Sequence, residues 1–256
     1  MSAQHKLASG LSQYGPLCVG LDPDPARMPA SVHGEVDSFL CEIIAATADL
    51  ACAYKINSAF FESLGAAGTH VLAAVRRAIP ERALFIWDAK RGDIANTNLH
   101  YARTAFEIIG ADAVTVHPYF GLDALAPFFH YTDHLTFVLC ATSEGTALQE
   151  LCIQPGGEPL WQWVAREVAR LSTGQCGLVV GATRPDSLRR VRQLAPELPL
   201  LVPGVGAQGG SVPAQPALIN VSRSILYASA GADFASAARA AAQTVRDACR
   251  ASAVAA

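Results

Sequence analysis

Eight short apolar runs recur along the chain, and each is followed by polar or glycine-rich residues. The runs are Leu17–Leu21, Ala53–Ile56, Ala83–Trp87, Ala113–Val116, Thr136–Cys140, Gly177–Gly181, Leu198–Val202 and Ala217–Val221. Segments with helical spacing of apolar residues lie between them, at 36–52, 60–79, 97–109, 160–171 and 185–194. Eight strands alternating with helices predict an α/β protein with a (β/α)8 TIM barrel.

A doubly wound open sheet is the alternative fold. It would use fewer strands and would favour an early G-x-G-x-x-G turn, and no such turn occurs near the start of this sequence. A chain of 256 residues that is 51% hydrophobic can bury one large core. We therefore expect a single barrel domain over residues 1–256, with an alanine-rich helix from about Ala228 onward that packs on the barrel exterior.

Charge and cysteine usage narrow the classes of partner. The net charge is -3 and no run of Lys or Arg occurs, so we expect no nucleic-acid partner. The amino terminus lacks the order of a signal peptide and no apolar run is long enough to span a bilayer, so we expect a cytoplasmic protein with no membrane partner. The seven cysteines include no C-x-x-C pair and indicate core packing.

No metal site is predicted. His130 and His134 have the i,i+4 spacing of a metal-binding pair, but no third ligand is evident in the sequence. A solvated helix end or loop is the better interpretation of this pair.

The third apolar run ends in an unusual set of charges, Asp88-Ala-Lys90-Arg-Gly-Asp93. In an extended strand side chains alternate between faces, so Asp88 and Lys90 should point the same way and Ala89 the opposite way. In a barrel the chemistry lies at the carboxyl ends of the strands. If these charges are buried, each needs the other or a ligand to offset desolvation, which indicates a reaction centre. The alternative is a solvated strand end with an incidental ion pair.

Other strand ends carry candidate binding groups. Asp22 follows the first run, Lys55 lies within the second, and Ser143 follows the fifth. The seventh run opens into the glycine-rich segment 203–210, and the eighth run is followed by Arg223. Glycines alone indicate a tight turn as readily as a ligand site. Together with a cation after the eighth strand they predict a phosphate site.

From Leu17 to Tyr227 the sequence resembles the orotidine 5'-monophosphate decarboxylase family, in its divergent bacterial type 2 branch. The matching segments are Val-Gly-Leu-Asp22-Pro, Lys55-Ile-Asn-Ser-Ala-Phe-Phe-Glu62, Asp88-Ala-Lys-Arg-Gly-Asp-Ile94 with Thr97, Val-Thr-Val-His-Pro-Tyr-Phe-Gly121, Ala-Thr-Ser143 and Pro-Gly-Val-Gly-Ala-Gln-Gly-Gly210. A sister group of magnesium-dependent sugar-phosphate decarboxylases and synthases shares the D-x-K-x-x-D motif. In that group an acid tends to occupy the place of Lys55.

The resemblance implies decarboxylation of orotidine 5'-monophosphate (OMP) to UMP and carbon dioxide, without a cofactor, in UMP biosynthesis. Lys90 would donate a proton to C6 of the pyrimidine, where a carbanion without a conjugated electron sink forms. Asp88 and Asp93 would stabilise its ammonium form, and Lys55 continues the alternation of charges. Asp88 would lie near the substrate carboxylate.

The same resemblance assigns the recognition groups. Asp22 and Thr97 would hold the ribose hydroxyls, and Ser143 the amide edge of the pyrimidine. Gln208 and Arg223 would hold the phosphate, and Ser222 would offer a backbone N–H. Asp93, Ile94 and Thr97 would reach the partner's site across a two-fold interface, which implies a homodimer with shared active sites. Asp93 is also a candidate N-cap of the helix that begins near Ile94, and both roles are compatible.

Two other functions stay open at this point. One is a magnesium-dependent sugar-phosphate enzyme of the same superfamily, against which Lys55 argues. The other is a non-catalytic nucleotide-binding barrel, which would need a damaged charge array, whereas all four charges are present. Glu144-Gly145 stands where many relatives of this branch have Asn-Pro, so the shape of that loop is open.

Overall fold

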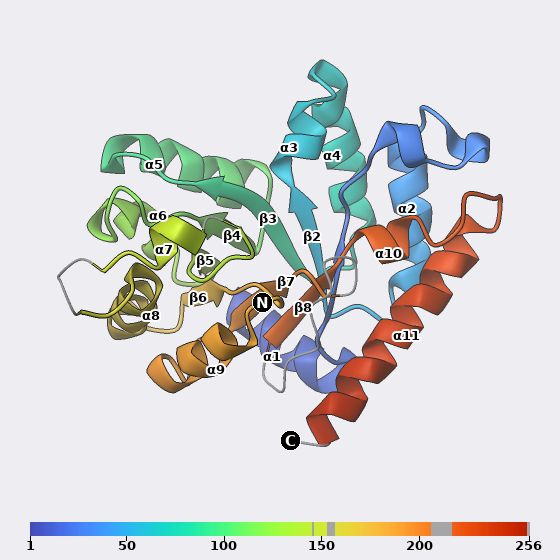
Figure 1. The fold of residues 1–256 in the computed structure, drawn as a ribbon. Helices are drawn as coiled ribbons and strands as arrows, with labels where there is room; N and C mark the ends of the chain where they lie inside the picture. The colour runs from blue at the N-terminus through green and yellow to red at the C-terminus, as the bar shows by residue number, and fades with distance from the viewer. Residues whose placement is uncertain (145, 153–156, 206–216, 255–256) are drawn as a thin grey trace.

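The computed structural model describes residues 1–144, 146–152, 157–205 and 217–254. Its centre is a closed barrel of eight strands that pair in chain order (Figure 1). All neighbours are parallel, and β8 pairs with β1 to close the barrel. The strands are β1 (Leu17–Gly20), β2 (Ala53–Asn57), β3 (Leu84–Arg91), β4 (Ala113–Val116), β5 (Leu135–Leu139), β6 (Cys176–Val179), β7 (Leu200–Pro203) and β8 (Ala217–Val221). The predicted (β/α)8 barrel is confirmed.

Helices surround the barrel (Figure 1). They are α1 (Ala3–Tyr14), α2 (Val36–Thr47), α3 (Ser58–Glu62), α4 (Ala66–Ala78), α5 (Ala95–Arg103), α6 (Ala126–Phe129), α7 (Thr146–Gln149), α8 (Leu160–Leu171), α9 (Pro185–Leu194), α10 (Arg223–Leu226) and α11 (Phe234–Val254). Short 3-10 turns cover Pro25–Arg27, Ala30–Val32 and Asp123–Leu125, and a π turn covers Thr104–Ile108. No helix within the described residues is both long and apolar enough to cross a membrane.

Several helix bounds differ from the expectation. The predicted helix 60–79 is two helices, because Gly65 adopts φ +61° and the chain turns there. The helix expected to start at 97 begins at Ala95 and passes into the π turn. The alanine-rich helix begins at Phe234, not near Ala228. Helices α8 and α9 have the predicted bounds.

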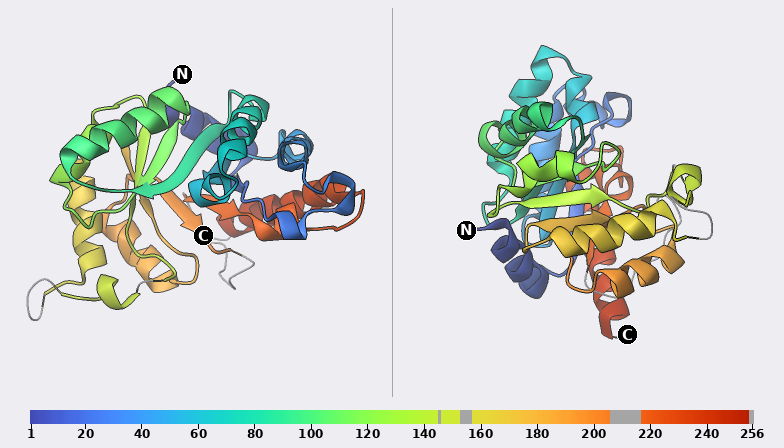
Figure 2. Two further views of the ribbon diagram at one scale, coloured as in Figure 1. Left: turned by 90° about the horizontal axis from the view of Figure 1, so that it is seen from above. Right: turned by 90° about the vertical axis from the view of Figure 1, so that its left-hand side faces the viewer.

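The core has two parts. The larger part lies between the strands and the surrounding helices, and the smaller part fills the barrel interior. Helix α1 contributes Ala3 and Leu7 to the interior cluster and lies at the end where the strands begin (Figure 2). The Lys6 ammonium lies 2.8 Å from Asp112 Oδ1, and Asp112 Oδ2 accepts a hydrogen bond from the Phe85 N–H. These contacts hold α1 across the amino-terminal end of the barrel, and the carboxyl end remains for a site.

Candidate active site

A cavity of about 640 Å³ opens at the carboxyl ends of the strands. Its polar lining includes most of the residues predicted from the strand ends: Asp22, Lys55, Asp88, Lys90, Ser143, Ser222 and Arg223. Its apolar wall includes Leu139, Val179 and Leu201. Side chains from β1, β2, β3, β5 and β8 ends therefore meet in one hollow, as the barrel topology predicts.

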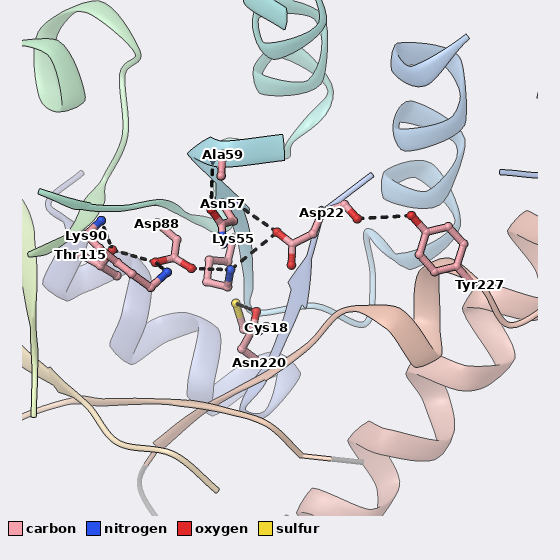
Figure 3. A network of polar contacts seen from close by, with 10 residues as sticks. All are labelled: Cys18, Asp22, Lys55, Asn57, Ala59, Asp88, Lys90, Thr115, Asn220 and Tyr227. Carbon is pink, nitrogen blue, oxygen red and sulfur yellow. Dashed lines mark hydrogen bonds and ion pairs between the residues drawn. The ribbon is translucent and has the colours of Figure 1, made fainter. Parts of the chain in front are cut away.

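Four of the charged side chains that line this cavity, Asp22, Lys55, Asp88 and Lys90, form a continuous chain of ion pairs (Figure 3). Lys55 Nζ lies 2.8 Å from Asp88 Oδ2 and 3.7 Å from Asp22 Oδ1. Lys90 Nζ lies 2.7 Å from the other oxygen of the same carboxylate, Asp88 Oδ1. Asp88 thus holds two ammonium groups, one on each oxygen, and all three side chains are brought together as predicted.

Electrostatics keep the buried members of this chain ionised. Burial alone would lower the pKa of Lys55, but the carboxylates of Asp22 and Asp88 outweigh it and raise that pKa above its ordinary value. Burial alone would raise the pKa of Asp88, but the ammonium groups of Lys55 and Lys90 hold it well below the usual range. Lys55 and Asp88 are therefore both charged at neutral pH.

The strand that carries Asp88 and Lys90 is irregular. Trp87 pairs with Val114, and Arg91 pairs with Val116, so three residues of β3 lie opposite one residue of β4. Within this bulge Lys90 has φ +48°, the left-handed region that L-residues rarely adopt. Asp88 and Lys90 lie together through this bulge, not through the simple strand alternation that the sequence predicts.

Thr115 is a site residue that the sequence reasoning missed. Its Oγ1 accepts a hydrogen bond from the Lys90 N–H at 2.9 Å and donates one to Asp88 Oδ1 at 2.8 Å. The only sequence signal is one hydroxyl in the middle of the apolar run of β4. From the sequence alone, this threonine is an ordinary strand residue, because its contacts with Lys90 and Asp88 are visible only in the structure.

The Asp22 loop is held by two other residues not singled out beforehand. The Asn57 N–H donates to Asp22 Oδ1 at 3.2 Å. The Tyr227 hydroxyl accepts from the Asp24 N–H at 2.6 Å and donates to the Asp22 carbonyl at 3.3 Å. The Arg27 guanidinium lies over the Tyr227 ring, 4.1 Å from its centre, at the cavity rim.

Three predicted residues lie outside the cavity lining in this chain: Asp93, Ile94 and Thr97. Helix α5 begins at Ala95 with Ile94 as its N-cap, so the expectation that Asp93 is the N-cap is wrong. Asp93 Oδ1 instead accepts from the adjacent Ile94 N–H at 2.7 Å, and the Ile94 side chain is 58% exposed. Asp93 therefore precedes the N-cap by one residue.

The remaining recognition residues lie near the rim. A Cβ placed on Gly181 would lie 2.6 Å from Ser143 Oγ, so the end of β6 packs directly against this serine. Ser222 Oγ is buried without a hydrogen-bond partner in the described part of the chain. Arg223 starts α10 and is exposed. Gln208 lies outside the described residues.

No cysteine or histidine is among the described residues that line the cavity. Cys18, Cys52, Cys140, Cys176 and Cys249 are buried free thiols. His134 packs its ring against Phe106 and Tyr131, whereas His130 is exposed. Among the residues described, no cluster of three or more His, Cys, Asp or Glu side chains is arranged to hold a metal ion.

Comparisons with known proteins agree on one family. Residues 15–243 match the model of the orotidine 5'-phosphate decarboxylase / HUMPS family. The orotidine 5'-phosphate decarboxylase of Thermomicrobium roseum is 47% identical over 96% of this chain and 94% of its own. That of Ralstonia nicotianae is 46% identical over 90% of this chain and 91% of its own. The solved structure of Leishmania donovani OMP decarboxylase superposes with a TM-score of 0.85, at 39% identity and full coverage of both chains.

Proposed function

The chain belongs to the orotidine 5'-phosphate decarboxylase family, and from this premise we propose how its own residues carry out the reaction. It is a decarboxylase of pyrimidine biosynthesis that acts on orotidine 5'-phosphate. The observation that carries the proposal is the chain of charges Lys55, Asp88 and Lys90 in the lining of the cavity.

Lys90 is the proton donor in this proposal. The bond between C6 and the carboxylate carbon breaks, carbon dioxide leaves, and the electron pair stays on C6. No conjugated sink receives that pair, so the enzyme must supply a positive charge and a proton at C6. The Lys90 ammonium transfers one proton to C6 to give UMP and regains it from solvent. No cofactor takes part.

Asp88 and Lys55 organise this step. Asp88 fixes the Lys90 ammonium at 2.7 Å and is itself fixed by Lys55 at 2.8 Å. The substrate carboxylate lies beside Asp88, and the repulsion between the two carboxylates is relieved as carbon dioxide leaves. The apolar side chains of Leu139, Val179 and Leu201 in the cavity wall keep the local dielectric low, which strengthens the field of the ammonium groups.

Recognition uses the rim of the cavity. We assign Asp22 to the ribose hydroxyls and Ser143 to the amide edge of the pyrimidine. We assign Arg223 and Ser222 to the phosphate. The Ser222 hydroxyl has no hydrogen-bond partner among the described residues. Gln208 is assigned to the phosphate from the sequence alone.

The active unit in this proposal is a homodimer. Asp93, Ile94 and Thr97 do not line the cavity of their own chain. Ile94 and Leu99 are 58% and 55% exposed, and Tyr119 and Phe120 are also exposed, so apolar surface surrounds this segment. A two-fold partner covers this surface and receives Asp93 beside its own Lys90, with Thr97 at the ribose.

The test is loss of the orotate absorbance when purified protein meets orotidine 5'-phosphate in excess chelator, with Lys90→Ala in parallel. We expect turnover by the wild type and a fall on the order of 10³-fold or more in the variant. No turnover by either folded protein would overturn the proposal and would favour a magnesium-dependent enzyme of the same superfamily that acts on a sugar phosphate. Tight UMP binding by both proteins without turnover would indicate a nucleotide-binding barrel.

A further inference from the structure

The bulge in β3 creates a hydrogen-bonding problem at the reaction centre. In a regular parallel pair each strand N–H donates to the neighbouring backbone. Between the Trp87–Val114 and Arg91–Val116 pairs, β3 has two more residues than β4. The extra residues have no backbone partner in step with them, and one of these residues is Lys90, at φ +48°.

Thr115 is the single β4 residue opposite this bulge, and its side chain supplies the missing partner. The hydroxyl accepts the Lys90 N–H at 2.9 Å, and its own proton goes to Asp88 Oδ1 at 2.8 Å. A hydroxyl has one donor and two acceptor positions, so it serves both groups at once (Figure 3). Thr115 is 1% exposed, so water does not compete for these bonds.

The two contacts act on the two groups that must be placed relative to C6. One holds the main chain of Lys90 in a conformation that persists only where its surroundings enforce it. The other fixes the Asp88 oxygen that also binds Lys90 Nζ. The same hydroxyl thus holds the main chain from which the Lys90 side chain starts and the Asp88 carboxylate that binds the Lys90 ammonium.

We propose that Thr115 is a positioning residue for decarboxylation, whose hydroxyl locks the Lys90 main chain and the Asp88 carboxylate into the reactive arrangement. This inference rests on the proposed function and extends it to a residue outside the charge chain. A side chain of the same shape without the hydroxyl should therefore bind nucleotide and yet react slowly.

The experiment compares Thr115→Val, which keeps the shape, with Thr115→Ser, which keeps the hydroxyl. Thr136→Val is the matched control, because Thr136 is also 1% exposed and lies on the adjacent strand β5, next to the inward-facing Leu135 and Phe137. For each protein we would measure kcat and KM for orotidine 5'-phosphate, Kd for UMP, and the melting temperature.

For Thr115→Val we expect kcat to fall about 10- to 100-fold, with KM and the UMP Kd within about threefold of wild type. Thr115→Ser should recover most of the rate, and Thr136→Val should keep it. Wild-type rates in Thr115→Val, an equal defect in Thr115→Ser, or an equal defect in Thr136→Val would each overturn the inference. If Thr115→Val does not fold, Thr115→Ala takes its place as the variant without the hydroxyl. A kcat in Thr115→Ala equal to that of Thr115→Ser would then overturn the inference. A wild-type protein without turnover would refute the proposed function instead.

Discussion

At the scale of single residues, Asp88 is the centre of the site because one buried carboxylate serves three donors. Lys55, Lys90 and Thr115 all bind it within 2.8 Å. The Lys55 side chain is only 5% exposed, so its charge depends on Asp88 and on the more distant Asp22. Removal of one partner from a buried pair costs more than the pair contributes, because it leaves an uncompensated charge.

A double-mutant cycle tests this dependence. Asp88→Asn should lower the free energy of unfolding by about 3 kcal/mol, because it leaves the Lys55 ammonium without its nearest carboxylate. Lys55→Met combined with Asp88→Asn should be less destabilising than the sum of the two single changes, by about 2 kcal/mol. Urea unfolding at neutral pH measures all four proteins. Strict additivity would show that the two side chains do not depend on each other.

The sequence predicted that Lys55, Asp88 and Lys90 lie close together, but it did not indicate which residues hold them there. Lys55 lies within β2, and Asp88 and Lys90 lie in the last half of β3, so the order of strands in a barrel makes them neighbours. Thr115 was not predictable, because its role depends on a bulge in a different strand. The place of Asp93 was predicted too close to its helix, since strand alternation says nothing about a chain that has left the strand.

At the scale of elements, the segments that follow β5 and β6 pack in direct contact. Gly181, just after β6, donates its N–H to the Ala141 carbonyl after β5 at 2.8 Å. A Cβ on Gly181 would lie 2.6 Å from Ser143 Oγ and 2.8 Å from the Ser143 backbone nitrogen. A rotation of the Ser143 side chain alone cannot relieve a contact with its backbone.

Gly181→Ala should therefore displace the Ser143 segment and weaken recognition of the pyrimidine edge. We expect KM for orotidine 5'-phosphate to rise about 10-fold or more, the effect of about 1.4 kcal/mol in binding. Gly231→Ala is the control, because the Cβ there would meet side-chain atoms and no backbone atom, with Asp233 Oδ1 at 2.8 Å and Ser229 Oγ at 3.4 Å. Steady-state kinetics of the two variants decide, and an unchanged KM in Gly181→Ala would remove Ser143 from the binding surface.

The helices that were predicted best have a proline at their start. Pro159 precedes α8 and Pro185 begins α9, so the bounds of these two helices were predictable. The helical pattern over 60–79 runs on through Gly65, and only the φ of +61° there separates α3 from α4. Helix α1 has no strand before it, so the alternation of runs gave no reason to expect it.

At the scale of the whole molecule, the proposed homodimer makes each site depend on two chains. Asp93→Asn and Lys90→Ala should each be nearly inactive alone. In a mixed dimer of the two variants, one site would have the intact Lys90 of one chain and the intact Asp93 of the other. Co-expression should recover about a quarter of the wild-type activity if the chains pair at random. Recovery of no activity from a mixed dimer of normal size would show that Asp93 serves its own chain.

The buried thiols make the stability of the whole chain sensitive to alkaline pH. Burial raises the pKa of Cys52 and Cys140 to about 12, and that of Cys249 to about 11. Thiols of the unfolded chain ionise near pH 9, so above this pH the unfolded state binds fewer protons and the free energy of unfolding falls. The stabilisation is complete below pH 9 and is lost as the pH approaches the folded values.

Ionisation of each such thiol in the unfolded chain should lower the free energy of unfolding by about 1 kcal/mol between pH 8 and pH 10. Denaturant unfolding at several pH values measures this slope. Cys249→Ala should make the slope shallower by that amount, and Cys152→Ala, which alters an exposed thiol, should leave it unchanged. Equal slopes in wild type and Cys249→Ala would contradict the assignment.

The position of the cavity bears on how the products leave. Helix α1 lies across the amino-terminal end of the barrel, and Cys18, Ile86 and Phe137 belong to the interior cluster that α1 extends with Ala3 and Leu7. The cavity that contains Lys55, Asp88 and Lys90 opens at the carboxyl ends of the strands. In the proposed reaction, carbon dioxide leaves through the same opening that admits the nucleotide. The contacts between the rim and UMP therefore influence the order in which the two products leave.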